Sequence, residues 1–145
     1  MAENTTVKRL RDRLERGILG SVRNAFVNGD TLYRLPNTAS IAFEYVEGEG
    51  ILLLLNQLGI AASSGSACTS GSLEPSHVMR AMAIPYTAAH GTIRFSLSRY
   101  NTEEEVDRVI AAVPPVIAKL RKLSPYWSGD GPAANPEQAF QPEYA

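Results

Sequence analysis

The chain has 145 residues, of which 44% are hydrophobic and 20% charged, and its formal net charge is −1. This near-neutral balance argues against bulk nucleic acid or an acidic membrane surface as a partner, and no apolar run approaches the ~20 residues of a membrane span. The one cysteine excludes an internal disulfide and a zinc site built from cysteine pairs. Since the N-terminus also lacks the apolar core of a signal peptide, we expect a protein of the reducing cytoplasm.

The first half of the chain predicts a helix, a strand and a second helix. Apolar residues recur at helical spacing over residues 3–19, and the charged residues between them are interpreted as a solvated helix face. A short apolar segment at residues 25–27 is followed by an Asn-Gly-Asp turn signal, and alternation over residues 41–45 predicts a strand. Residues 47–58 are too apolar for a surface helix, so we expect them to pack on the sheet.

The second half predicts another strand and a long helix. Apolar and polar residues alternate from Thr92 to Ser98, which is typical of a half-buried strand. Thr102 and Glu105 form a capping box at the start of the last helix, and a proline pair at residues 114–115 predicts a kink or an interruption in it. A further short helix is predicted from Pro75 to about Met82.

Strands and helices that alternate in one short chain predict an α/β fold, specifically an α+β two-layer sandwich with helices on a small sheet. We predict one domain over residues 1–126. Proline, glycine, asparagine and glutamine dominate after it, which predicts a flexible tail over residues 127–145.

The most informative segment surrounds Cys68. A lone cysteine is commonly a small buried hydrophobe, but residues 61–72 are almost entirely alanine, serine, threonine and glycine. No large apolar neighbour in this run would hold the thiol in a core, and small residues favour a mobile, solvated loop. A mobile and exposed thiol suits nucleophilic chemistry, which requires the thiolate.

Three sequence blocks carry a family resemblance. The blocks SSGSACTSGSLEPSHVMRAM (63–82), GTIRFSLSRYNTEEEVD (91–107) and LPNTASIAFEYVEGE (35–49) resemble segments of NifS/IscS-type cysteine desulfurases, in the same order along the chain. The resemblance extends over about residues 3–126. It implies the small C-terminal domain of a fold-type I pyridoxal phosphate enzyme of the class V aminotransferase family.

The resemblance also implies a reaction and its residues. Enzymes of this family convert L-cysteine to L-alanine with pyridoxal phosphate, and Cys68 is similar to the nucleophile that becomes a persulfide. Arg94 is similar to the residue that holds the substrate carboxylate, a role that suits the planar guanidinium fork. A surface or interface ion pair is the alternative for Arg94. Histidine titrates near neutral pH, so His77 and His90 are candidates to assist Cys68. An exposed helix residue and a satisfied turn histidine are the favoured interpretations, and Arg99 is interpreted as structural.

The cofactor half of the family is missing. The three lysines, Lys8, Lys119 and Lys122, lie outside any segment like the family's cofactor-lysine segment, so we expect no pyridoxal phosphate on this chain alone and no independent activity. Three functions stay open: a desulfurase part completed by another region, a persulfide carrier without cofactor chemistry, and an inactive remnant that pairs with a homologue.

The expected partners follow from the same resemblance. They are L-cysteine as substrate, an iron–sulfur scaffold protein as sulfur acceptor, and a second copy in a homodimer, with a link to nitrogenase maturation. No metal, nucleic acid or membrane is expected. We also expect the chain to self-associate, with residues 47–58 and 93–97 as the sources of exposed apolar surface.

Overall fold

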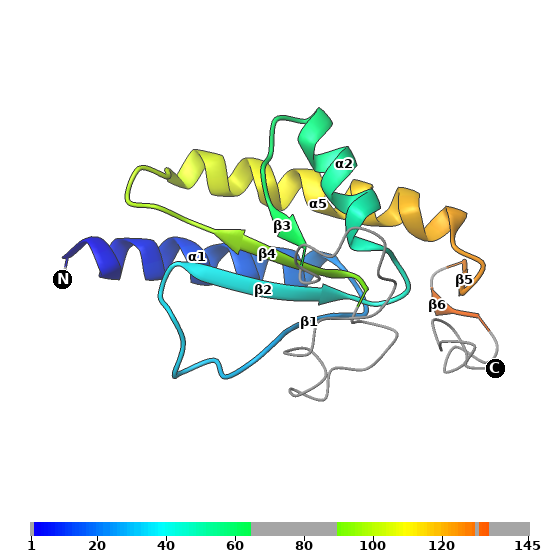
Figure 1. Cartoon of the computed structure of the whole chain (residues 1–145), viewed down its shortest axis with the longest axis horizontal. Helices are drawn as coiled ribbons and strands as arrows, with labels where there is room; N and C mark the ends of the chain where they lie inside the picture. Colours follow the sequence, from blue (N-terminus) through cyan, green and yellow to red (C-terminus); the bar gives the residue numbers. More distant parts are fainter. Residues whose placement is uncertain (1, 65–89, 130, 134–145) are drawn as a thin grey trace.

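The computed structural model of the chain describes residues 2–64, 90–129 and 131–133. Three helices, α1 (Ala2–Ser21), α2 (Gly48–Gln57) and α5 (Glu103–Leu123), pack on one face of a four-stranded antiparallel sheet (Figure 1). The strand order is β1 (Ala25–Val27), β2 (Thr38–Phe43), β4 (Thr92–Ser96) and β3 (Ser63–Ser64). The predicted two-layer α+β arrangement is confirmed.

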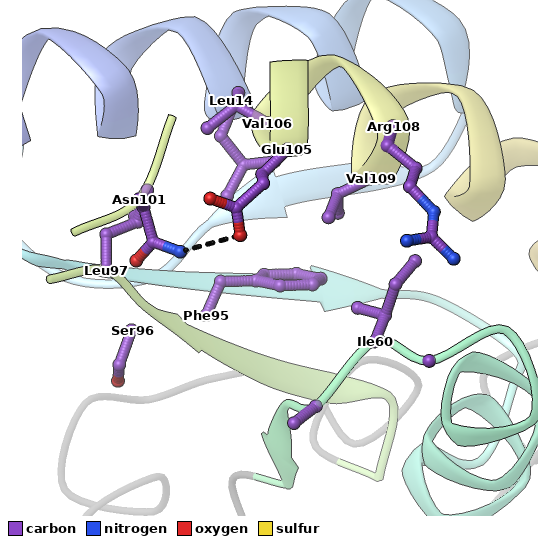
Figure 2. A pocket seen from close by; sticks show the side chains of 12 residues that line it. Leu14, Ile60, Phe95, Ser96, Leu97, Asn101, Glu105, Val106, Arg108 and Val109 are labelled. Atoms are coloured by element: carbon purple, nitrogen blue, oxygen red, sulfur yellow. Dashed lines mark hydrogen bonds between the residues drawn. The ribbon is translucent and has the colours of Figure 1, made fainter. Parts of the chain in front are cut away.

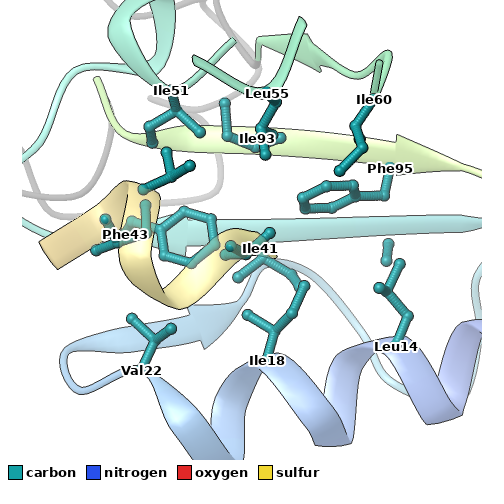
Figure 3. Close-up of a cluster of buried hydrophobic side chains, with 14 of the residues drawn as sticks. Leu14, Ile18, Val22, Ile41, Phe43, Ile51, Leu55, Ile60, Ile93 and Phe95 are labelled. Carbon is teal, nitrogen blue, oxygen red and sulfur yellow. The ribbon is translucent and has the colours of Figure 1, made fainter. Parts of the chain in front are cut away.

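The hydrophobic core lies between the sheet and the three helices (Figure 3). Alternate residues of the central strands point into it, among them Ile41 and Phe43 of β2 and Ile93 of β4, which are all fully buried. Leu14 and Ile18 of α1 meet these side chains from one helix, and Ile51 and Leu55 meet them from α2; their place in the core follows from the apolar spacing of each segment.

The opposite face of the central strands is polar. Thr38 and Ser40 of β2 and Arg94 and Ser96 of β4 alternate with the core residues, so they point away from the helices. Within the described part of the chain, no helix covers this face. The sheet therefore separates an apolar helix side from a polar side.

The proline pair does not interrupt the last helix. α5 runs without a break from Glu103 to Leu123 with both prolines inside it, so the predicted interruption is wrong. The capping box is confirmed, because the Thr102 hydroxyl accepts the Glu105 amide at 3.2 Å and the Glu105 carboxylate accepts the Thr102 amide at 3.0 Å. A buried stripe on both sides of the prolines holds the helix together despite the lost amide donors; it comprises Val106, Val113, Val116 and Ile117.

Two charged residues of α1 are buried, which corrects the interpretation of its charges as one solvated face. Arg11 is 2% exposed and Glu15 is 7% exposed. The Glu15 carboxylate pairs with Arg34 (Nη2 to Oε2, 2.8 Å), and Arg11 donates to the Leu35 carbonyl at 3.0 Å. Both contacts tie the loop between β1 and β2 to α1, and burial is tolerated because the charges have partners.

Regular structure continues past the predicted domain boundary at residue 126. Strands β5 (Trp127–Ser128) and β6 (Gly131–Pro132) form a hairpin, and the Trp127 ring lies 4.1 Å from the Arg121 guanidinium. The first residues of the predicted tail thus pack against the end of α5, while residues 134–145 are outside the described chain.

The expected sources of exposed apolar surface need correction. Ile93, Phe95 and Leu97 are buried beneath the helices, whereas α2 exposes Leu53 (60%) and not its core side. The largest apolar exposures lie in the loop after β1, at Leu32 (83%) and Tyr33 (87%). None of the helices in the described ranges is long and apolar enough to cross a membrane.

Candidate functional site

Arg94 occupies the middle of β4 on the polar face of the sheet. Its neighbours in the strand, Ile93 and Phe95, are buried in the core, so the alternation of the strand directs Arg94 outward. Its side chain is exposed and, within the described residues, makes no ion pair or hydrogen bond. Among the described residues, the surface ion pair considered for Arg94 therefore has no partner.

The sheet register surrounds Arg94 with small hydroxyl side chains. Ser40 of β2 is its partner on one side and Ser63 of β3 its partner on the other. Residues paired directly across antiparallel strands share one face and have Cβ atoms about 5 Å apart. Serine is short, so neither neighbour covers the guanidinium, and both add hydroxyl groups beside it. This row of Ser40, Arg94 and Ser63 is called the arginine row below.

A buried asparagine braces the arginine row. Asn28, which follows β1, is 8% exposed and donates through Nδ2 to Ser40 Oγ at 3.3 Å and to Thr92 Oγ1 at 3.2 Å. Its backbone amide also donates to the Ser40 carbonyl at 2.9 Å. Asn28 thus links β2 to β4 directly beside Arg94. The sequence around Asn28 indicates only a turn, because its two side-chain partners are 12 and 64 residues away.

The other predicted site residues are distributed as follows. Cys68 and His77, together with the predicted helix from Pro75 to Met82, lie outside the described residues. His90 lies in the turn before β4, and its carbonyl accepts the Gly48 amide at 2.7 Å. Burial lowers the pKa of His90 and so favours the neutral imidazole, while the Glu47 carboxylate has a smaller, opposite effect. Arg99 stacks on Tyr100 at the strand end, 4.8 Å from the ring centroid.

A separate hollow of about 340 Å³ lies on the helix side of β4, below α5 (Figure 2). Phe95 forms its floor, and Ile60 and Val109 form part of its walls. Its charged groups are already engaged: the Glu105 carboxylate belongs to the capping box, and Arg108 donates to the Leu58 carbonyl at 2.6 Å. The charged side chains of this hollow therefore already have partners, and the arginine row is the better candidate site.

Comparison with known proteins identifies the family. The family model Aminotransferase class-V matches residues 2–109, and the chain belongs to this family. Within it, the chain is 75% identical over 142 residues to "Cysteine desulfurase" of Azotobacter chroococcum mcd 1 and 74% identical over 142 residues to "Cysteine desulfurase NifS" of Azotobacter vinelandii. Both alignments cover 98% of this chain, so the resemblance to NifS-type cysteine desulfurases is confirmed.

The same comparison limits what can be transferred. The chain spans only 36% and 35% of the length of these two relatives. Solved structures agree: a "NIFS-LIKE PROTEIN" matches 81% of the chain with 31% identity and a TM-score of 0.68, over 28% of its own length. The NifS-like protein from Rickettsia africae ESF-5 matches 79% of the chain with 27% identity and a TM-score of 0.67. The fold thus corresponds to a part of NifS-like enzymes.

The residues present do not suit a pyridoxal phosphate site. The cofactor requires a lysine for its Schiff base in an enclosed cavity, with a carboxylate near the pyridine nitrogen. Lys8 on α1 and Lys119 and Lys122 on α5 are all exposed on helix surfaces. Lys122 borders a hollow, but no acidic residue of the described chain lines it. No cluster of three metal-ligating side chains occurs among the described residues.

Proposed function

We propose that this chain supplies the substrate-carboxylate site and the sulfur-accepting cysteine of a NifS-type cysteine desulfurase. The observation that carries the proposal is the arginine row: an exposed guanidinium without a partner in the described part, held between two serines on the polar face of the sheet. An amino-acid carboxylate is the natural partner of such a group, since the guanidinium donates two parallel hydrogen bonds to it.

The proposed reaction moves one sulfur atom. L-cysteine loses its thiol sulfur and takes up a proton at carbon to become L-alanine, while the thiolate of Cys68 forms a sulfur–sulfur bond and becomes a persulfide. The carbon is reduced and the two sulfurs are oxidised, so no external oxidant is needed. In this family pyridoxal phosphate supplies the electron sink, and polypeptide other than this chain would have to hold it.

The position of Cys68 in the sequence supports the same site. Ser63 is paired with Arg94, and Cys68 follows it by five residues. Five residues span at most about 18 Å, so chain connectivity limits how far the thiol is from the arginine row. From the resemblance to NifS-type cysteine desulfurases we also propose a persulfide on Cys68 that a homodimeric enzyme passes to an iron–sulfur scaffold protein in the cytoplasm.

A second candidate is a persulfide carrier without cofactor chemistry. The exposed lysines favour it, because none of them lies in an enclosed site suited to a Schiff base. A carrier accepts a persulfide on Cys68 from another protein and does not bind L-cysteine. The two candidates therefore differ in the role of Arg94.

The deciding experiment supplies what the chain lacks. The purified chain is incubated with L-cysteine and pyridoxal phosphate, alone and together with a desulfurase whose own nucleophilic cysteine is replaced by alanine. Alanine formation and the mass of Cys68 are measured, and the visible spectrum reports cofactor binding to the chain alone. The desulfurase proposal predicts alanine and persulfide in equal amounts in the mixture, and neither with Cys68→Ala.

Matched arginine variants separate the two candidates. Arg94→Gln should reduce alanine formation per unit substrate by about 10- to 100-fold, which corresponds to a lost charge-assisted hydrogen bond of about 1.5–3 kcal/mol. Arg99→Gln removes the same charge at the strand end and should leave the rate within a factor of about two. If Cys68 takes up persulfide from an intact donor while Arg94→Gln has no effect, the carrier candidate replaces the desulfurase one. If Cys68 never carries sulfur, both fail.

A further inference from the structure

A second hollow, of about 380 Å³, lies where α1 and α5 end beside the β5–β6 hairpin. It is separate in location from the arginine row, because none of its described lining residues belongs to β2, β3 or β4. Its lining includes Arg23 after α1, Arg121 and Lys122 in the last turn of α5, and Trp127 of β5. We call it the cationic hollow.

The charged residues that line the cationic hollow within the described chain are all of one sign. Three cationic residues line it, and none of the described lining residues is acidic. Arg23 and Lys122 are exposed and form no ion pair or hydrogen bond with the described residues. Like charges that converge on one space repel each other, and the repulsion is relieved when an anion enters it.

The third cation is buried. Arg121 is 5% exposed and donates to the carbonyls of Arg23 (2.7 Å), Asn24 (3.1 Å) and Glu44 (3.1 and 3.3 Å). These four hydrogen bonds leave one of the five guanidinium N–H groups, on Nη1, without a described acceptor. All of the acceptors are neutral carbonyls, and no carboxylate forms an ion pair with Arg121 in the described chain.

Burial without an ion pair has an electrostatic consequence. It lowers the pKa of Arg121 to about 10, because desolvation disfavours the charged form more strongly than Glu44 and Tyr45 favour it. The guanidinium nevertheless stays protonated at neutral pH. Its face lies 4.1 Å from the centroid of Trp127, which fixes both groups at the wall of the hollow.

Interaction with the C-terminal ends of helices explains only one of the three cations. A cation near the end of a helix interacts favourably with the helix dipole, and Arg121 fulfils that role by binding the carbonyls that follow α1. Arg23 and Lys122 bind none of these carbonyls. Within the described residues both remain available to a ligand, next to the Trp127 ring.

We propose that the cationic hollow binds a phosphate group, held by Arg23 and Lys122 beside the stacked pair of Arg121 and Trp127. The volume exceeds the needs of free phosphate and accommodates a phosphate monoester with a planar ring against Trp127. The site goes beyond the proposed desulfurase function, and it does not depend on Cys68 or Arg94.

Trp127 makes the test direct, because it is the only tryptophan in the chain. Its fluorescence is followed while inorganic phosphate or phenyl phosphate is added at constant ionic strength, with chloride as the balancing anion. We expect a saturable change with both ligands. Tighter binding of phenyl phosphate would identify a ring-bearing monoester as the ligand class, and equal binding would identify the phosphate group alone.

Charge-matched variants decide whether the hollow is the site. Arg23→Gln and Lys122→Gln should each weaken phosphate binding about tenfold or more, the range of one lost charged hydrogen bond. Lys119→Gln is the control, because Lys119 lies on the same helix as Lys122 and carries the same charge but does not line the hollow. The affinity of this variant for phosphate should be unchanged. All three residues are exposed, and far-ultraviolet circular dichroism confirms that the variants fold.

Two results would overturn the proposal. One is the absence of any phosphate-dependent change beyond that of chloride at equal ionic strength. The other is an equal loss of affinity in Lys119→Gln, which would indicate general charge attraction and not a site. Neither result bears on sulfur transfer, so the desulfurase proposal would stand or fall separately.

Discussion

At the scale of single residues, Gly91 fixes the start of the strand that carries Arg94. The Phe43 amide donates to the Gly91 carbonyl at 2.9 Å, so the end of β2 and the start of β4 approach closely here. A Cβ atom on Gly91 would overlap the Phe43 carbonyl oxygen and lie 2.7 Å from that of Val46. Backbone atoms on both sides cannot move aside as a flexible side chain would.

We therefore predict that Gly91→Ala lowers the free energy of unfolding by at least about 2 kcal/mol, as overpacking in a rigid environment does. Urea denaturation followed by circular dichroism measures the change. Gly20→Ala is the matched control, because no atom lies within 4 Å of its added methyl group and alanine favours the helix. Equal stability of Gly91→Ala and the unmodified chain would contradict the close approach.

Single residues also mark the limits of sequence-based prediction. The outward direction of Arg94 follows from the alternation of its strand. The neighbours of Arg94 do not, because the pairing of Ser63 and Ser40 with it depends on the register between strands whose paired residues are 31 and 54 positions apart. The burial of Arg11 and Arg121 could not be predicted either, since it depends on hydrogen bonds to carbonyls 24 to 98 residues away. Local pattern carries no information about such partners.

At the scale of secondary-structure elements, prediction from sequence was strongest where local chemistry decides. The apolar spacing of α1 and the capping box of α5 both rest on residues within four positions of each other, and both are confirmed. The predicted interruption of α5 at the proline pair is wrong, because it considers only the local preference of proline for a helix break. Tertiary burial on both sides of the pair outweighs that preference.

This balance makes a prediction for the exposed proline of the pair. Pro115 lies inside a continuous helix and faces solvent, so Pro115→Ala restores an amide donor to the carbonyl of Ala111 without a steric change in the core. We expect a higher unfolding temperature. The free energy of unfolding should rise by about 1 kcal/mol or more, even though alanine gives the unfolded chain more conformational entropy than proline does.

Pro125→Ala provides the comparison, because Pro125 follows the end of α5 and replaces no helical hydrogen bond. Pro125→Ala should lower the free energy of unfolding by up to about 1 kcal/mol, because it raises the entropy of the unfolded chain and changes nothing else. A stabilised Pro125→Ala together with an unchanged Pro115→Ala would show that α5 is not strained at the pair.

At the scale of the whole molecule, the loop between β1 and β2 presents apolar side chains from a fixed frame. Leu32 and Tyr33 are 83% and 87% exposed, and Leu35 is 70% exposed. The Asp30 carboxylate accepts the amides of Leu32 (2.7 Å) and Tyr33 (2.8 Å), which also lowers the pKa of Asp30. The loop is anchored to α1 by the contacts of Arg34 and Arg11, so its apolar side chains do not fold back onto the body.

Exposed apolar side chains held in a rigid loop favour association, because little conformational entropy remains to be lost on contact. We predict that the isolated chain self-associates with rising concentration and that the double variant Leu32→Ser, Tyr33→Ser weakens this association about tenfold or more. Sedimentation velocity over a hundredfold concentration range measures it. Leu123→Ser is the control, since Leu123 is 76% exposed at the opposite end of the chain on α5. A monomer at every concentration would refute the prediction, and a larger effect of Leu123→Ser would move the contact from the loop to the end of α5.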